Sequence, residues 1–228
     1  MKKFIRLNVT AEGQSEERFV KDTLSNHLGT FNISTDVRCV LTSKDRFKSY
    51  RGGLLSYNKA KKDIQTWIKE DNNKDVFFTT MFDLYALPKD FPRYNESLQI
   101  RDPYKRITFL EKSFNEDINN YKFIPYLQLH EFEALLFTNI KMLELEYFNH
   151  EKPINSLAQL IDNIGNPELI DDGPNTAPSK RIIKLIPEYE YDKVSVGSTI
   201  VNLIGIKDLL SCCHHFNSWI KKLESLST

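Results

Sequence analysis

Strand-like segments alternate with helix-like segments over the first 130 residues, and this alternation constrains the fold more than any other feature. Residues 3–10, 34–42, 76–82 and 123–129 carry apolar side chains in the patterns of strands, and residues 15–29 and the segments around Ile64 and Leu110 have helical spacing. The alternation predicts βαβ crossovers and an α/β fold with a mainly parallel sheet flanked by helices. After Glu131 the spacing is mostly helical, beginning with the segment EFEALLF. We expect a core of residues 1–137 and a helical region of residues 138–228 packed on it, in one continuous domain.

Several protein classes are excluded. No stretch approaches the eighteen or so apolar residues of a membrane span, and Arg6 and Asn8 interrupt the amino-terminal apolar run, which does not resemble a secretory signal. Three cysteines do not make a disulfide framework. We therefore expect a soluble cytoplasmic protein. The segment Cys212-Cys213-His214-His215 does not predict a zinc site, because consecutive helical residues point about 100° apart and cannot converge on one ion.

Acidic residues follow three of the predicted strands. Glu12 follows the first strand, Asp83 follows residues 76–82, and Glu131 and Glu133 follow residues 123–129. The carboxyl ends of parallel strands meet at one edge, where open α/β sheets bind ligands. Four carboxylates on one rim repel one another unless they share cations, and oxygen-only ligand sets suit Mg²⁺ or Mn²⁺. The sequence thus predicts a metal site for phosphoryl transfer or phosphodiester cleavage.

Helix capping is the alternative reading of the segment around Glu12. Ser15 is a suitable N-cap, Glu16 and Glu17 would lie in the first helical turn, and Gly13 permits a sharp turn. Capping accounts for Glu16 and Glu17 without any function. It does not account for Glu12, which precedes the cap.

The residues after the last strand have alternatives of the same kind. Glu131 and Glu133 are either ligands or charges at a helix start above a buried apolar face. His130 either orients a ligand or acts as an acid, or is merely hydrogen-bonded at a strand end. The sequence does not choose between these readings.

Charge is balanced overall but uneven along the chain. Lysine plus arginine and aspartate plus glutamate each total 31, which argues against a general polyanion-coating protein. Residues 38–69 are rich in basic side chains, and they form either a solvated face or a patch that contacts phosphates; the candidates are Lys44, Arg46, Lys48 and Arg51. Lys180 and Arg181, after a turn at 172–178, are either a surface pair or a phosphate clamp and transition-state stabiliser.

The chain resembles known families. Glu12-Gly13 with Glu16 four residues on, and Asp83 after a later strand, resemble the Toprim superfamily of topoisomerases, primases and OLD-type nucleases. Nearly the whole chain resembles the bacterial family called domain of unknown function 4276, through the segments VTAEGQSEERFV, RGGLLSYNKAKKDI, MFDLYALPKDFP, YLQLHEFEALLF, DDGPNTAPSKRI and CCHHFNSWIKKLE. That family is Toprim-like and often lies beside ABC-type ATPase genes in phage-defence loci.

The resemblance implies roles for individual residues. Glu12 corresponds to the Toprim general base or acid that also contacts metal, and Glu16 to a second ligand of OLD-type nucleases. Asp83 matches the first aspartate of the Asp-x-Asp motif, but Tyr85 stands where the second is expected. This leaves either an inactive domain or one in which Glu131 or Glu133 supplies the missing ligand. Gly13, His130 and Tyr85 are expected beside the ligands, with Lys180 as a catalytic cation.

Two functions therefore remain. One is a Mg²⁺- or Mn²⁺-dependent nuclease acting on DNA or RNA, with an ABC-type ATPase as partner in phage defence. The other is a non-catalytic module that binds a partner or nucleic acid through the basic segment. Tyr85 favours the second function, whereas the additional acids favour the first.

Overall fold

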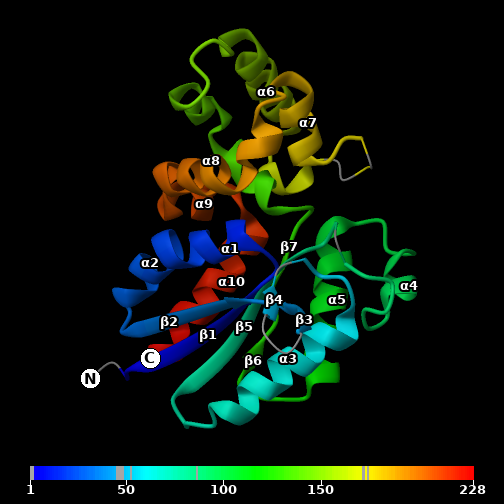
Figure 1. Cartoon of the computed structure of the whole chain (residues 1–228), viewed down its shortest axis with the longest axis vertical. Coiled ribbons are helices and arrows are strands. Elements are labelled where there is room, and N and C mark those ends of the chain that lie inside the picture. Colours follow the sequence, from blue (N-terminus) through cyan, green and yellow to red (C-terminus); the bar gives the residue numbers. More distant parts are fainter. Residues whose placement is uncertain (1–2, 45–48, 52, 86, 171–172, 174) are drawn as a thin grey trace.

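A parallel sheet forms the centre of the computed structural model, which describes residues 3–44, 49–51, 53–85, 87–170, 173 and 175–228. The strand order is β2-β1-β5-β6, and β7 also pairs with β5 (Figure 1). All of these pairs are parallel. This confirms the predicted α/β fold. The strands are β1 (Ile5–Ala11), β2 (Ile33–Cys39), β5 (Val76–Asp83), β6 (Phe123–Ile124) and β7 (Leu127–Gln128).

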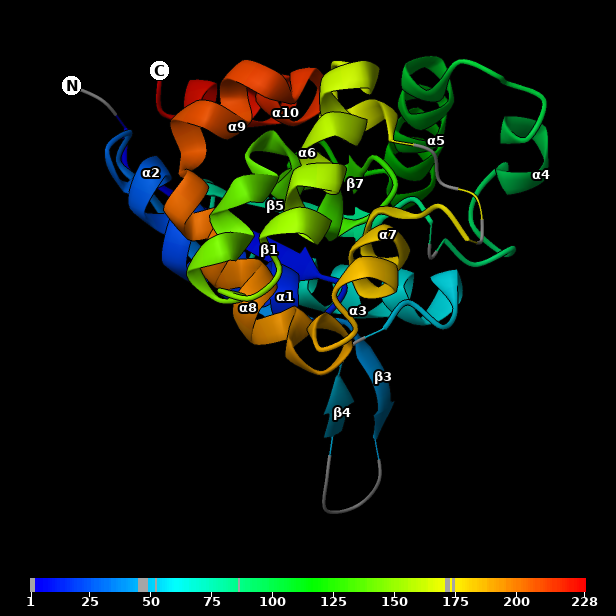
Figure 2. The ribbon, with the colours of Figure 1, turned by 90° about the horizontal axis from the view of Figure 1, so that it is seen from above.

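Helices cover both faces of the sheet (Figures 1 and 2). Leu7 and Val9 of β1 belong to an apolar cluster shared with α1 (Gln14–Phe19), α2 (Ser25–Gly29) and α10 (His214–Glu224). Phe78 and Phe82 of β5 belong to a second cluster shared with α3 (Tyr57–Glu70) and α5 (Pro103–Ile118). Strands buried on both faces explain why the strand segments are so apolar.

The predicted helix 15–29 is continuous but begins earlier than expected. It runs through α1, a π-helical turn (Val20–Leu24) and α2. Gly13 is the N-cap, so the expectation that Ser15 caps the helix was wrong. The Glu16 carboxylate, in the third helical position, accepts a hydrogen bond from the N–H of the N-cap Gly13 at 2.8 Å. Glu16 thus has the capping contact that the sequence allowed.

Two predicted strands are interrupted. Residues 123–129 form β6 and β7 separately, because Pro125 has no N–H to donate to a strand ladder and the Tyr126 N–H bonds the Thr80 hydroxyl instead, at 3.1 Å. The Leu127 N–H bonds the carboxylate of Glu111 at 2.9 Å. Residues 34–42 divide into β2 and β3 (Leu41–Lys44), which pairs antiparallel with β4 (Ser49–Arg51) and projects from the body (Figure 2).

The helical region extends the first apolar cluster beyond the sheet. Its elements are the 3₁₀ helices η2 (Phe132–Thr138), η3 (Ile140–Leu145) and η4 (Pro167–Leu169) and the α-helices α6 (Glu151–Ile164), α7 (Pro178–Leu185), α8 (Tyr189–Ile204) and α9 (Ile206–Cys212). A short helix, α4 (Tyr94–Ser97), precedes α5. The Phe132 ring of η2 meets the Phe19 ring of α1 edge-on at 6.0 Å. EFEALLF is helical as predicted, but as a 3₁₀ helix.

In the described part of the chain, no single helix combines the length and apolar character needed to cross a membrane. Only α8 and α9 together meet both criteria, and they meet at an angle of 83°.

Candidate active site

Glu12 connects the ends of two neighbouring strands. It follows β1, and its carboxylate accepts a hydrogen bond from the Asp83 N–H at the end of β5, at 2.9 Å. The Leu54 N–H also donates to this carboxylate, and the Glu12 carbonyl accepts from the Gly53 N–H at 2.8 Å. The Glu12 side chain is therefore held between β5 and the 53–54 loop.

Asp83 lies in the most unfavourable electrostatic environment of the site. Burial raises the pKa of its carboxyl well above the usual range, and the negative charges of Glu16 and Glu12, and then of Glu133 and Glu131, raise the pKa further. Its Oδ1 atom is buried and has no hydrogen-bond partner among the described residues. A buried carboxylate oxygen in this position can bind either a proton or a cation.

Glu12 and Glu16 share this environment. Burial raises the pKa of each from 4.5 to about 7, and the charge of Glu12 contributes to the shift at Glu16. The Glu16 residue is only 5% exposed. The hydrogen bonds that they accept from backbone N–H groups lower both pKa values, but burial outweighs them.

Glu131 and Glu133 bring the helical region to the same edge. Both are buried. Glu131 accepts a hydrogen bond from the Ser179 N–H at the start of α7, and it makes no side-chain capping bond to its own helix η2. Burial, and then the charge of Glu131, raise the pKa of Glu133 to about 7. These two acids thus connect different elements, beyond marking a helix start.

Lys193 is the site residue that the sequence reasoning missed. It projects from α8, and its Nζ atom lies 3.2 Å from a carboxylate oxygen of Glu133. Burial by itself lowers the pKa of Lys193, but Glu133, Glu131 and Asp83 raise it, so the ammonium is charged at neutral pH. The available signal was its spacing: Lys193 lies four residues after buried Tyr189 and three before buried Val196, on one face of the helix.

The other predicted residues lie around this cluster. Lys180 follows Ser179 and is exposed, and the Arg181 guanidinium donates to the Thr176 carbonyl at 2.6 Å. His130 is buried, with a left-handed φ of 64°, and its carbonyl accepts from the Tyr85 N–H at 2.8 Å. A β-carbon on Gly13 would lie 3.2 Å from the Glu16 carboxylate. Of the basic patch, Arg46 and Lys48 lie outside the described residues, and Lys44 and Arg51 are described in their backbone alone.

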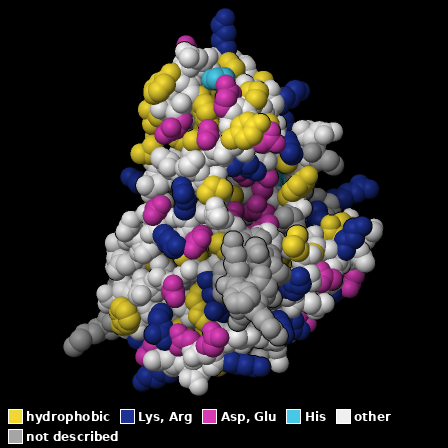
Figure 3. All heavy atoms as spheres, viewed as in Figure 1, with side chains coloured by type: hydrophobic (Ala, Val, Ile, Leu, Met, Phe, Trp, Pro, Cys, Tyr) yellow, Lys and Arg dark blue, Asp and Glu magenta, His cyan; other side chains and the backbone are white. Residues whose placement is uncertain are grey.

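Acidic side chains gather in a hollow between the α6–α8 region and the sheet (Figure 3). The candidate ligands are all hard oxygen donors, and the buried oxygen of Asp83 has the chemistry of a Mg²⁺ or Mn²⁺ ligand. Within the described residues, no group of three His, Cys, Asp or Glu side chains is arranged to hold an ion. Magnesium commonly binds one or two carboxylates and completes its coordination with water and substrate phosphate. The pair Glu12 and Asp83 suits that mode.

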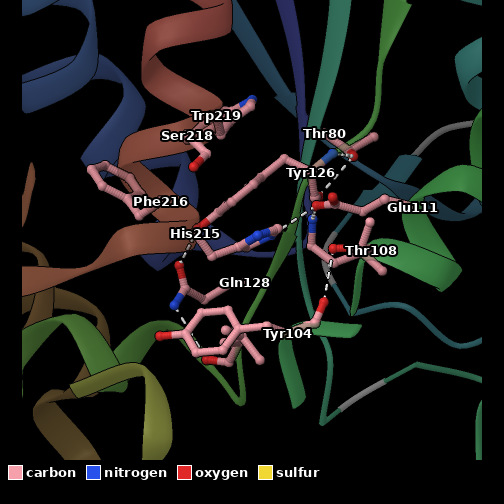
Figure 4. Close-up of polar contacts among 12 residues, drawn as sticks. Thr80, Tyr104, Thr108, Glu111, Tyr126, Gln128, His215, Phe216, Ser218 and Trp219 are labelled. Atoms are coloured by element: carbon pink, nitrogen blue, oxygen red, sulfur yellow. Dashed lines mark hydrogen bonds and ion pairs between the residues drawn. The ribbon is translucent and has the colours of Figure 1, made fainter. Parts of the chain in front are cut away.

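The Cys212–His215 segment is engaged elsewhere. Cys213 is buried, and the His215 ring lies 3.0 Å from the Glu111 carboxylate and stacks on the Tyr126 ring (Figure 4). Tyr126 in turn stacks on Trp219, with ring centroids 4.0 Å apart. These contacts fix α10 against α5 and the end of β6.

Comparisons with known proteins place the chain in a family. Two solved structures of the C-terminal region of the Xanthomonas campestris pv. campestris OLD protein, phased with platinum and with iodine, are similar to it. Each is 13% identical, with TM-scores of 0.46 and 0.45; they cover 97% of this chain, and 93% and 95% of theirs. No curated protein matches the chain. The model of the family described as domain of unknown function (DUF4276) matches residues 11–224. The chain therefore belongs to the DUF4276 family.

Proposed function

We propose that this protein is a metal-dependent nuclease of Toprim type that hydrolyses phosphodiester bonds of DNA or RNA. The observation that carries the proposal is the group of buried and half-buried carboxylates at the carboxyl edge of the sheet. Glu12, Glu16, Asp83 and Glu133 all have raised pKa values, and Lys193 is the cation beside them. Strongly perturbed acids in a hollow are more typical of a functional site than of a structural one.

The acids divide into different roles. Glu12 and Asp83 would hold Mg²⁺ or Mn²⁺, with Glu16, Glu131 and Glu133 as further ligands. The metal, when bound, supplies charge stabilisation at the attacking and leaving oxygens. Glu12 would also have the acid–base role that the Toprim resemblance implies, and a bound cation would keep its carboxylate ionised, so that it could accept a proton from the attacking water. Lys193, charged and held by Glu133, would attract the substrate phosphate, and exposed Lys180 would contact it from the rim.

The substrate contacts are proposed from the distribution of charge, and the partner is proposed from the family resemblance. A neutral protein with an acidic site needs basic residues elsewhere to hold a polyanion. We assign this role to Lys44, Arg46, Lys48 and Arg51, with Arg181, and we propose an ABC-type ATPase as partner in a cytoplasmic phage-defence system. Charge removal in the basic segment should weaken binding and reduce its salt dependence by about one slope unit for each phosphate that the variant no longer neutralises.

Cleavage assays with matched acid-to-amide variants test the proposal. Wild type, Glu12→Gln, Asp83→Asn and Glu116→Gln would be incubated with single- and double-stranded DNA and RNA in Mg²⁺, Mn²⁺ or EDTA, with and without a candidate ABC-type ATPase partner. Glu116 is an exposed acid of α5, with 57% of its side chain accessible. We expect cleavage by wild type and Glu116→Gln with metal only. Metal-independent cleavage, or full activity of Glu12→Gln and Asp83→Asn, would reject this assignment.

A second candidate is a non-catalytic module that binds nucleic acid or a partner protein. Two observations favour it: no three acidic, histidine or cysteine side chains in the described residues are arranged around an ion, and Tyr85 occupies the second acid position of the motif. Binding without cleavage under every metal condition would support this module.

A further inference from the structure

Two large apolar side chains are exposed beside Glu12. Tyr85 is 45% exposed and Leu55 is 74% exposed. The N–H groups of Asp83 and Leu54 both bind the Glu12 carboxylate. Leu55 follows Leu54 directly, and Tyr85 lies two residues after Asp83. Two residues of chain span at most about 7 Å, so both side chains begin close to the acids.

The backbone of both residues is fixed. The Tyr85 N–H donates to the His130 carbonyl at 2.8 Å, and the preceding Leu84 N–H donates to the Gln128 carbonyl at 3.0 Å. Phe82 and Leu84 are buried in one apolar cluster. The strand β5 ends at Asp83, and the chain bends at Leu84 and turns at Tyr85. The bond to the carbonyl of His130, which precedes Glu131, and the separation of two residues from Asp83 keep the exposed Tyr85 ring close to the acids.

We propose that Tyr85, with Leu55 beside it, stacks on an unpaired nucleobase next to the phosphate bound at the acids. This rests on the proposed nuclease function and narrows its substrate to single-stranded or locally unpaired nucleic acid. Within a duplex the base faces are already stacked on one another, so only an unpaired base offers a face to an aromatic ring.

The chemistry of the rim agrees with this ligand. A base is uncharged and can approach a group of carboxylates that repels phosphates. Stacking on an aromatic ring depends little on which base is bound. This fits the site, because the neighbouring backbone N–H groups are already hydrogen-bonded within the protein and are not free to bind a base. Tyrosine at the second acid position also removes one negative charge from the path of the strand.

Binding measurements with matched aromatic variants test the inference. Wild type, Tyr85→Ala, Tyr85→Phe and Tyr121→Ala would be titrated, in Mn²⁺, with fluorescent phosphorothioate oligonucleotides that resist hydrolysis, as single strands, blunt duplexes and duplexes with an unpaired loop. Tyr121 is the control, because it is 86% exposed and precedes β6, at the opposite edge of the parallel sheet.

We expect Tyr85→Ala to weaken binding of the single strand and the looped duplex by roughly 5- to 100-fold, the range of one base–aromatic stack. Duplex binding should change little, and Tyr85→Phe and Tyr121→Ala should resemble wild type. Equal losses on single strand and duplex, or no loss in Tyr85→Ala, would overturn the inference. Cleavage of ordinary oligonucleotides separates the two proposals. Cleavage by a protein whose binding does not change in Tyr85→Ala rejects only the stacking proposal, and Tyr85-dependent binding without cleavage rejects only the nuclease proposal. If no oligonucleotide binds, both proposals are rejected.

Discussion

Removing the charge of Glu12 should stabilise the metal-free protein. Burial raises the pKa of this carboxyl from 4.5 to about 7 in the folded state. At about 1.4 kcal/mol per pKa unit, the ionised group costs the fold at most about 3.5 kcal/mol. An acid whose pKa is raised on folding lowers stability as pH rises. The cost begins near the unfolded pKa of 4.5 and is complete above about pH 7.

Glutamine at position 12 keeps an oxygen for the Asp83 N–H and loses the charge. We therefore expect Glu12→Gln to raise the free energy of unfolding by about 1–3 kcal/mol at pH 8 in EDTA, or the melting temperature by roughly 2–12 °C. The gain should shrink as pH falls toward 4.5 and vanish below it, where the wild-type carboxyl becomes protonated in both states. Loss of charge at position 12 also relieves Glu16 and Asp83, whose pKa values it raises.

Thermal unfolding from pH 4.5 to 8.5 in EDTA measures the cost of the Glu12 charge. Titrations with Mn²⁺ and Mg²⁺ at pH 8 then measure the stabilisation by metal. Wild type should gain stability with metal, as any ligand of the folded state provides, and Glu12→Gln should gain less. Glu116→Gln should follow wild type throughout. A Glu12→Gln variant that is destabilised in EDTA at pH 8, or that gains as much from metal as wild type, would refute the electrostatic reasoning.

Two further predictions concern residues that support the site and the fold. Gly197→Ala should destabilise the protein by about 1–3 kcal/mol in chemical denaturation, because the added β-carbon would lie 2.8 Å from the buried Tyr189 hydroxyl, and Tyr189→Phe in the same chain should restore the loss. Burial by itself lowers the pKa of His215, but its contact with Glu111 raises the pKa above 6.5. The stabilising pair is then complete below pH 6.5 and is lost as pH rises through the folded pKa, and His215→Gln should flatten that pH dependence of unfolding.

The sheet was predictable because its signals are local. Buried parallel strands are short apolar runs, and the acids Glu12 and Asp83 follow them directly, so their shared edge could be expected from topology alone. The break at Pro125 was also visible in the sequence, but the spacing of apolar residues across 123–129 masked it. The fold of residues 1–137 thus followed from periodicity, apart from element ends and the separation of β3 from β2.

The remainder of the site depends on contacts between distant segments. Lys193 reaches Glu133 from a helix that begins more than fifty residues later, and no local pattern fixes how α8 lies over α1. The bond from the Ser179 N–H to Glu131 has the same origin. Such pairings are set by the packing of the helical region, which a single sequence does not reveal, so the sequence did not indicate that Lys193 lies beside the acids.

The bond between Glu111 and Leu127 also bears on how copies of the protein meet. Beside β6, a strand from another molecule would need free N–H donors, but Pro125 has none and the Leu127 N–H is bonded by Glu111. On the far side of the sheet, the Val37 N–H of β2 is bonded by the Asp36 carboxylate. One donor at each margin of the sheet is thereby withheld from intermolecular strand addition, which disfavours edge-to-edge pairing at these positions.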